Sequence, residues 1–223
     1  MKSKCKECTR SPKNLLMLPP SYLKLGAVMN YTEKLSRDNC VFVLVDFLDG
    51  FFPGIKTIDH GLLRKNAEAF ARLSQIFSIP TIMLGEEGDF RGNFFPQVVA
   101  HADHAIRVER HVPSAWDEPE FQKQLANIGR KKVVLGGISL DICTLQLTID
   151  LIGGGYEPYV VVDVSGSDTT LNETAAMMRM TQAGAVMVSW ASIASEIMKD
   201  WQTPEGPAVG QLYQDFSYWG NRI

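Results

Sequence analysis

Short apolar runs alternate with longer amphipathic stretches from about residue 40 to residue 201. The runs are rich in valine, isoleucine and leucine and do not alternate with polar residues, which is typical of strands buried on both faces. They predict strands at 41–45, 80–84, 105–108, 132–138, 158–164 and 186–190. Apolar residues at helical spacing predict helices at 59–77, 118–128, 142–152, 171–183 and 193–201.

Strands that alternate with helices favour a mostly parallel sheet covered on both faces. We therefore expect an α/β fold, a three-layer α/β/α domain with a six-stranded, mostly parallel, Rossmann-like sheet, over residues 37–201. Residues 1–36 form a polar, proline-containing N-terminal extension. Residues 202–223 are rich in aromatic side chains, and we expect this C-terminal tail to pack on the domain or on a neighbouring subunit.

The composition, 45% hydrophobic and 21% charged over 223 residues, is that of an ordinary globular domain. The net charge of −3 argues against a general polyanion binder, so no nucleic acid partner is expected. No apolar run approaches the roughly 18 residues that span a bilayer. Four cysteines do not indicate a disulfide scaffold, and no signal-peptide pattern is evident. We therefore expect a cytoplasmic protein without a membrane partner.

Cys5 and Cys8 form a C-x-x-C pair in the lysine-rich N-terminal extension. A structural zinc site normally needs four ligands, and no second C-x-x-C or H-x-x-x-H follows in the sequence. A redox pair is expected beside a βαβ unit, which this extension lacks. We therefore interpret the pair as part of a flexible tail.

Cys143 lies where the strand at 132–138 gives way to the helix at 142–152. Unpaired N–H groups and the positive dipole end at a helix N-terminus favour the reactive thiolate. Most buried cysteines are inert packing residues, so position alone leaves both interpretations open.

Three chemically useful side chains follow different predicted strands. Asp46 follows the first, Arg110 the third and Cys143 the fourth. Ligands of open parallel sheets bind at the carboxyl ends of the strands, so the three side chains are expected at one crevice. Asp46 can act as a base and Arg110 can supply charge near a thiolate. Taken singly, the aspartate can be a turn cap and the arginine a solvated surface charge.

The segments VFVLVD (41–46), RHVPSAW (110–116) and GISLDIC (137–143) together resemble the isochorismatase-like cysteine hydrolases. SAWDEPEF (114–121) and EIMKDW (196–201) are similar to the YcaC-like subgroup of that family. The resemblance covers roughly residues 38–212. It implies a homo-oligomer, from a dimer up to an octamer.

The resemblance also implies a catalytic triad with Cys143 as nucleophile, Asp46 as general base and Arg110 in the family's usual lysine position. It implies a non-proline cis peptide at Ile138–Ser139, whose backbone contributes with Cys143 to an oxyanion hole. The expected activity is metal-independent hydrolysis of a C–N bond in a small amide-like substrate, through a thioester intermediate and without a cofactor.

The metal-binding branch of the family carries Asp-x-His near the first strand end, and DFLDGFF (46–52) lacks it, so no metal is expected. His60, His101, His104 and His111 are interpreted as surface or structural residues.

Leu48 and Leu140 stand where many family members have glutamine and threonine. A catalytically silent oligomeric binding protein of the same fold is therefore the main alternative. A nucleotide-binding module is disfavoured because the first strand ends in VDFLDG rather than in G-x-G-x-x-G. A thiol redox protein would need a resolving cysteine, and the predicted core offers only Cys40.

Overall fold

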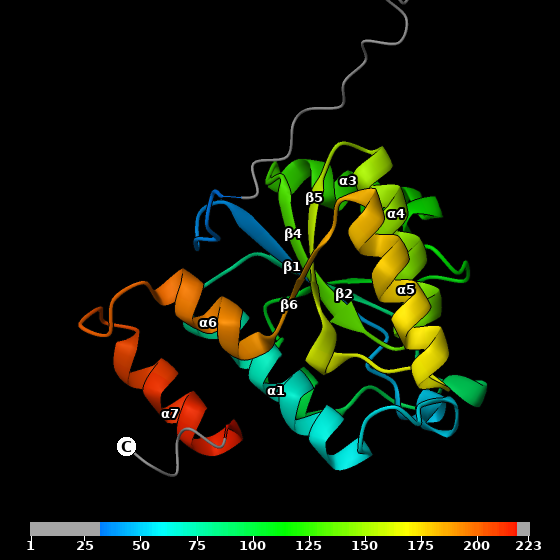
Figure 1. Ribbon diagram of the computed structural model, residues 1–223, viewed down its shortest axis with the longest axis horizontal. Helices are drawn as coiled ribbons and strands as arrows, with labels where there is room; N and C mark the ends of the chain where they lie inside the picture. Colours follow the sequence, from blue (N-terminus) through cyan, green and yellow to red (C-terminus); the bar gives the residue numbers. More distant parts are fainter. Residues whose placement is uncertain (1–31, 218–223) are drawn as a thin grey trace, which may run out of the picture.

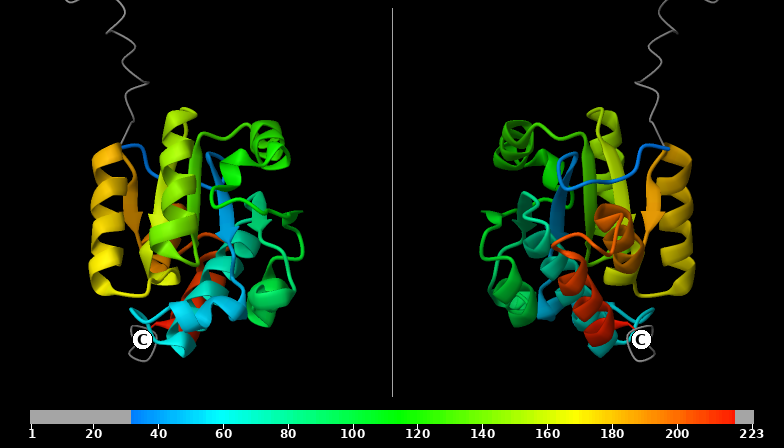
Figure 2. Two further views of the ribbon diagram at one scale, coloured as in Figure 1. Left: turned by 90° about the vertical axis from the view of Figure 1, so that its right-hand side faces the viewer. Right: turned by 90° about the vertical axis from the view of Figure 1, so that its left-hand side faces the viewer.

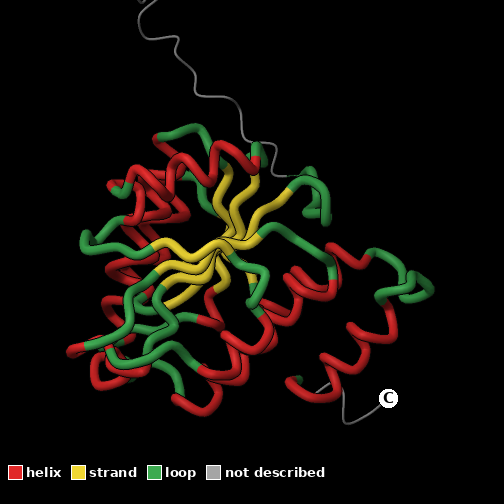
Figure 3. The backbone as a smooth tube through the Cα atoms, turned by 180° about the vertical axis from the view of Figure 1, so that it is seen from behind, coloured by secondary structure: helices red, strands yellow, loops and turns green. Residues whose placement is uncertain are grey.

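The computed structural model describes residues 32–217, which form a six-stranded, all-parallel sheet with helices on both faces (Figures 1 and 3). The strands lie in the order β3-β2-β1-β4-β5-β6. Their bounds are β1 (Cys40–Val45), β2 (Thr81–Leu84), β3 (Ile106–Val108), β4 (Lys132–Gly137), β5 (Glu157–Val161) and β6 (Val186–Val188). The predicted α/β fold class is confirmed.

Seven α-helices are present in the described residues. They are α1 (His60–Ile76), α2 (Pro96–His101), α3 (Pro119–Ile128), α4 (Leu145–Gly153), α5 (Thr170–Ala183), α6 (Trp190–Met198) and α7 (Gly206–Phe216). Several of these helices start at an N-cap residue whose side chain accepts a hydrogen bond from a free backbone N–H group. Asp59 accepts the N–H of Leu62 at the start of α1, and Ser189 forms a reciprocal capping box with Ser192 at the start of α6.

The central strand β1 is buried on both faces, so its side chains enter two separate hydrophobic cores. Phe42 and Leu44 pack in the core that α1, α2, α6 and α7 cover. Val41 and Val43 pack in the core that α3, α4 and α5 cover. Burial on both faces explains why β1 reads as a continuous apolar run rather than as an alternating one.

The C-terminal segment packs on its own chain as far as it is described. In α7, Val209, Leu212 and Tyr213 are buried, and Figures 1 and 2 show this helix beside α1. The Tyr213 hydroxyl donates to the carbonyl oxygen of Ala191 in α6 at 2.5 Å. This helix is therefore part of the same compact body as the sheet. Tyr218 and Trp219 lie outside the described residues, as do Cys5 and Cys8.

Some predicted boundaries differ from the structure. The strand predicted at 158–164 ends at Val161, and Val162–Val164 form a 3-10 turn. The helix predicted from residue 142 is preceded by a π-helical turn, Leu140–Thr144, which contains Cys143. None of the helices in the described part of the chain has the length and apolar character needed to cross a membrane.

Candidate active site

The strand order reverses direction between β1 and β4, which makes their carboxyl ends the topological switch point of the sheet. The two strands pair in register up to Val45 and Gly137. Asp46 directly follows β1, and the segment that carries Cys143 directly follows β4. Ligands of open parallel sheets bind in the crevice at such a point, because the connections on its two sides diverge.

Gly137 allows the chain after β4 to pass close to the end of β1. Its φ of +152° lies in a region that favours glycine, and a Cβ there would overlap the carbonyl oxygen of Val45. A Cβ on Gly136 would overlap Val164. The two glycines therefore let the segment that carries Cys143 lie against the end of β1 and the turn that follows β5.

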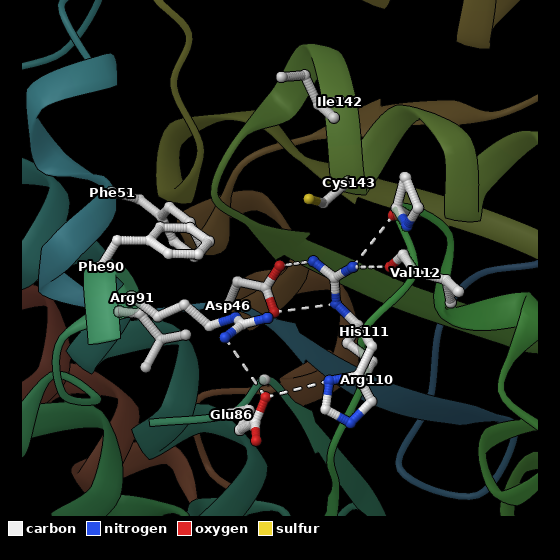
Figure 4. Close-up of a pocket in the computed structure, with 13 residues that line it drawn as sticks. Asp46, Phe51, Glu86, Phe90, Arg91, Arg110, His111, Val112, Ile142 and Cys143 are labelled. Carbon is white, nitrogen blue, oxygen red and sulfur yellow. Dashed lines mark hydrogen bonds and ion pairs between the residues drawn. The ribbon is translucent and has the colours of Figure 1, made fainter. Parts of the chain in front are cut away.

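Asp46 and Arg110 form a buried, two-pronged ion pair (Figure 4). The Arg110 Nε donates to Asp46 Oδ1 at 3.0 Å, and its Nη2 contacts Asp46 Oδ2. Asp46 is only 2% exposed and Arg110 9%. Arg110 Nη1 also donates to the carbonyl oxygens of Val112 and Pro113. Buried charges require such pairing, so these side chains are held in one arrangement rather than solvated.

The Asp46 backbone has a φ of +47°, in the left-handed region. Aspartate tolerates this region better than most residues, and non-glycine residues that adopt it are concentrated at functional sites.

Cys143 is a partly exposed free thiol in the π-helical turn that leads into α4. In Figure 4 its Sγ points into the pocket above the Asp46 carboxylate. Backbone N–H groups in the first turn of a helix lack partners within that helix, so this turn can offer donors to a developing negative charge. The peptide bond between Ile138 and Ser139, at the start of this segment, is cis.

Hydrogen bonds to neighbouring elements fix the Cys143 segment. Leu140 N donates to the carbonyl oxygen of Gly166 at 2.8 Å, and Thr144 Oγ1 donates to that of Gly137 at 3.2 Å. On the other side, Ser114 Oγ donates to Asp150 Oδ2 in α4 at 2.6 Å. The last bond ties the loop that follows Arg110 to the helix that follows Cys143, and so holds the two parts of the site together.

The two cysteines in the described residues differ in chemistry. Cys40 is fully buried in β1, and burial raises the pKa of its thiol to about 12. A thiol with this pKa stays protonated and unreactive at neutral pH. Cys143 is partly exposed at a pocket, which is the setting expected of a reactive cysteine.

A pocket of about 220 Å³ brings Asp46, Arg110 and Cys143 together. Its other lining residues include three apolar side chains and three polar ones, namely Phe51, Phe90 and Ile142 with Glu86, Arg91 and His111 (Figure 4). Glu86 Oε2 lies 3.5 Å from Arg91 Nη1 and 3.3 Å from His111 Nδ1. These three side chains give this part of the pocket a polar wall.

A second pocket, of about 360 Å³, adjoins the first. Cys143, Phe51 and Ile142 line both pockets, whereas Ile138 and Ser139 line only the second of these two. Of the five site residues predicted from the sequence, Asp46 and Arg110 therefore line the first pocket and Ile138 and Ser139 line the second. Cys143 lines both.

Sequence reasoning missed several residues of the first pocket. His111 is exposed, in agreement with its interpretation as a surface or structural residue, and it also lines the pocket beside Arg110. Phe90 and Arg91 lie between β2 and α2. The only sequence signal that they line the pocket is that this segment follows the carboxyl end of a strand. Of the two leucines that depart from the family pattern, Leu48 lines the first pocket, whereas Leu140 is buried in the core.

The family profile of the isochorismatase domain matches residues 40–192. The chain is 26% identical to the probable hydrolase YcaC of Escherichia coli over 76% of its length and 82% of that protein. It is 24% identical to the secreted isochorismatase effector Isc1 of Phytophthora sojae, over 86% of its length and 93% of that protein.

Two solved structures share the fold. YcaC from Pseudomonas aeruginosa, in complex with hexane-2,5-diol and covalent acrylamide, aligns with a TM-score of 0.79 and 26% identity, covering 84% of this chain and 93% of that one. YcaC from Escherichia coli, described as an octameric hydrolase of unknown specificity, aligns with a TM-score of 0.78 and 26% identity, covering 82% and 90%. The chain therefore belongs to the isochorismatase family and is similar, within it, to the YcaC hydrolases.

Proposed function

We propose that the protein is a metal-independent cysteine hydrolase that cleaves a C–N bond in a small amide-like substrate. The observation that carries this proposal is the partly exposed thiol of Cys143 in the same pocket as the buried Asp46–Arg110 pair. Membership of the isochorismatase family supports a hydrolytic role. The covalent acrylamide on YcaC from Pseudomonas aeruginosa shows that a similar protein reacts with an amide-bearing electrophile.

In the first half of the proposed reaction, the Asp46 carboxylate takes the proton from the Cys143 thiol. The thiolate attacks the substrate carbonyl carbon, and the carbonyl oxygen becomes an oxyanion. Backbone N–H groups between Ser139 and Cys143 stabilise that charge, apart from that of Leu140, which is bonded to Gly166. The C–N bond then breaks, the nitrogen takes the proton from Asp46, and the amine or ammonia leaves a thioester on Cys143.

In the second half, water attacks the thioester carbonyl and gives its proton to Asp46. The C–S bond breaks, the carboxylic acid product leaves, and the proton returns to the sulfur or to solvent. Arg110 takes no part in proton transfer in this scheme. Its role is to hold the Asp46 carboxylate in place and to supply positive charge beside the thiolate.

We also propose a cytoplasmic homo-oligomer. The described surface exposes large apolar side chains that a neighbouring copy could cover, including Leu171 and Met178 on α5 and Trp201 after α6. YcaC of Escherichia coli is described as octameric.

The second candidate function is a catalytically silent binding protein. Leu48 favours it, because a leucine in the pocket wall offers no polar atom to a substrate amide. Ammonia release from a panel of primary amides, with wild type beside Cys143→Ala, separates the two functions. The hydrolase predicts release by wild type alone. The binding protein predicts no release by either, together with saturable ligand binding by both.

A further inference from the structure

Cys143 lies between two pockets of different chemistry. The first contains the ion pair of Asp46 and Arg110 and is further lined by charged side chains. The second is lined largely by apolar atoms, including those of Ile55 and Ile138. Because Cys143 lines both, a substrate carbonyl attacked by its sulfur can place one substituent in each pocket.

The path of the proton decides which substituent enters which pocket. In the proposed reaction the group that takes the thiol proton must pass it to the leaving nitrogen. Asp46 is that group, and of these two pockets it lines only the first. The leaving nitrogen therefore lies on the side of the first pocket, where the charged side chains suit a small polar fragment. The acyl substituent, on the opposite side of the tetrahedral carbon, points into the second pocket.

Resting on the proposed function, we propose that the second pocket is the acyl pocket and that the substrate is an amide of an uncharged, apolar acyl group with a compact polar amine. Ile55 and Ile138 are almost completely buried, so they form a fixed base for this pocket, and the more exposed Phe51 and Ile142 add apolar surface that an acyl chain can cover. Burial of each methylene of an acyl chain against such a surface favours binding.

Two carboxylates in the second pocket are the reason to expect an uncharged acyl group. Asp141 and Asp168 both line it. Asp168 Oδ1 lies 2.6 Å from the Nζ of Lys56, in an exposed pair that screens only part of its charge. An acyl group that ends in a carboxylate would meet charge of the same sign there, which disfavours its binding.

Ser139 adds one polar contact at the thiol end of the acyl pocket. Its hydroxyl is buried and makes no hydrogen bond within the part of the chain that the structure describes. A buried hydroxyl without a partner is costly, and a substrate oxygen beside Cys143 would supply one.

The test uses p-nitrophenyl esters of acetate, butyrate and hexanoate, and the p-nitrophenyl monoester of succinate. The thiolate attacks the ester carbonyl, the acyl group remains on sulfur, and p-nitrophenolate leaves without needing a proton from Asp46. The burst of p-nitrophenolate measures acylation, and peptide mass spectrometry places the acyl group. The acyl pocket predicts acylation of Cys143 about tenfold faster with hexanoate than with acetate, and slower with succinate than with butyrate.

Two variants and one control locate the preference. Ile55→Trp fills the second pocket and should abolish the preference for hexanoate while acetylation persists. Asp168→Asn should raise the succinate-to-butyrate rate ratio several-fold. Because the Asp168 side chain is half exposed, this variant should fold even where Ile55→Trp does not. Asp103→Asn, at a carboxylate that is 79% exposed and lines neither pocket, should leave both ratios unchanged.

Failure of the two proposals gives different results. If no ester acylates Cys143, the proposed cysteine hydrolase is wrong. If Cys143 is acylated with no dependence on chain length, and Asp168→Asn leaves the succinate-to-butyrate ratio at the wild-type value, the nucleophile stands and the acyl pocket is wrong.

Discussion

Arg110 Nε donates to Asp46 Oδ1 at 3.0 Å, in a pair that is buried beneath the partly exposed thiol of Cys143. The same guanidinium donates to the carbonyl oxygens of Val112 and Pro113, so its orientation is fixed from two sides. A carboxylate held in this way has little freedom to turn away from the pocket. The pair therefore combines a stabilising role in the fold with a positioning role in the site.

Arg110→Met should lower the free energy of unfolding by about 3–5 kcal/mol, because it leaves the Asp46 carboxylate buried without its counter-charge. It should also slow the alkylation of Cys143, since positive charge beside the thiolate is lost. Arg110→Lys keeps the charge but not the two-pronged geometry, and should retain part of both properties. Urea unfolding and the rate of iodoacetamide labelling check the two effects. Wild-type behaviour of both variants would remove Arg110 from the proposed catalytic triad.

Asp46→Asn should abolish amide turnover, because the amide keeps the shape of the side chain but cannot accept the thiol proton. The circular dichroism spectrum should remain that of wild type. Turnover close to the wild-type rate in a folded Asp46→Asn protein would show that another group takes the proton.

Limited iodoacetamide at pH 7 should label Cys143 before Cys40, because burial raises the pKa of the Cys40 thiol to about 12. Peptide mass spectrometry after short labelling reads the order directly, and it reports Cys5 and Cys8 in the same experiment. Label on the N-terminal pair alone, with Cys143 unmodified, would count against a reactive thiol at the pocket.

Ionisation of the Asp163 carboxyl should lower the free energy of unfolding as the pH rises from about 4 to 6. Burial raises the pKa of this carboxyl from 3.8 to about 6, and the hydrogen bond from Trp190 N opposes that shift only in part. The folded state therefore holds the proton more tightly than the unfolded state, so ionisation destabilises the fold, by about 3 kcal/mol at pH 7. Asp163→Asn removes the ionisation and keeps an acceptor for Trp190.

Urea unfolding of wild type and Asp163→Asn at pH 4.5 and pH 7 checks this effect. The advantage of the variant should grow with pH over this interval. A constant difference between the two proteins would show that Asp163 does not titrate there.

Gly137→Ala should destabilise the protein by about 3 kcal/mol or more, because a Cβ at this backbone conformation overlaps the carbonyl oxygen of Val45. Gly153→Ala is the matched control, since a Cβ there meets no atom within 4 Å and alanine is a better helix former than glycine. Thermal unfolding should show a large loss for the first variant and no loss for the second. Equal melting temperatures would mean that β1 and the Cys143 segment do not approach as closely as described.

Light scattering at micromolar concentration should give a mass of at least two chains, each of 24.8 kDa. The exposed apolar side chains of α5 and the region after α6 motivate this expectation. A mass equal to that of one chain would refute the proposed homo-oligomer.

The sequence predicted the strands well where burial on both faces leaves a continuous apolar run, as in β1. It failed at the end of β5, where Val162 and Val164 continue the apolar pattern although the chain turns. That Asp46, Arg110 and Cys143 line one pocket could be predicted, because each lies within a few residues of the carboxyl end of a strand. Arg91 and His111 could not, since their approach to Glu86 depends on how two loops fold against each other. The second pocket depends on how the segment after β1 and the loop that holds Asp168 fold against the Cys143 segment.

The most direct test of the central claim follows hexanamide hydrolysis by wild type, with acid quenching and peptide mass spectrometry during turnover. The mechanism predicts ammonia release together with a transient hexanoyl thioester on Cys143, and neither with Cys143→Ala. Ammonia release that persists in Cys143→Ala, or turnover by wild type with no acyl group on Cys143 at any quench time, would contradict it.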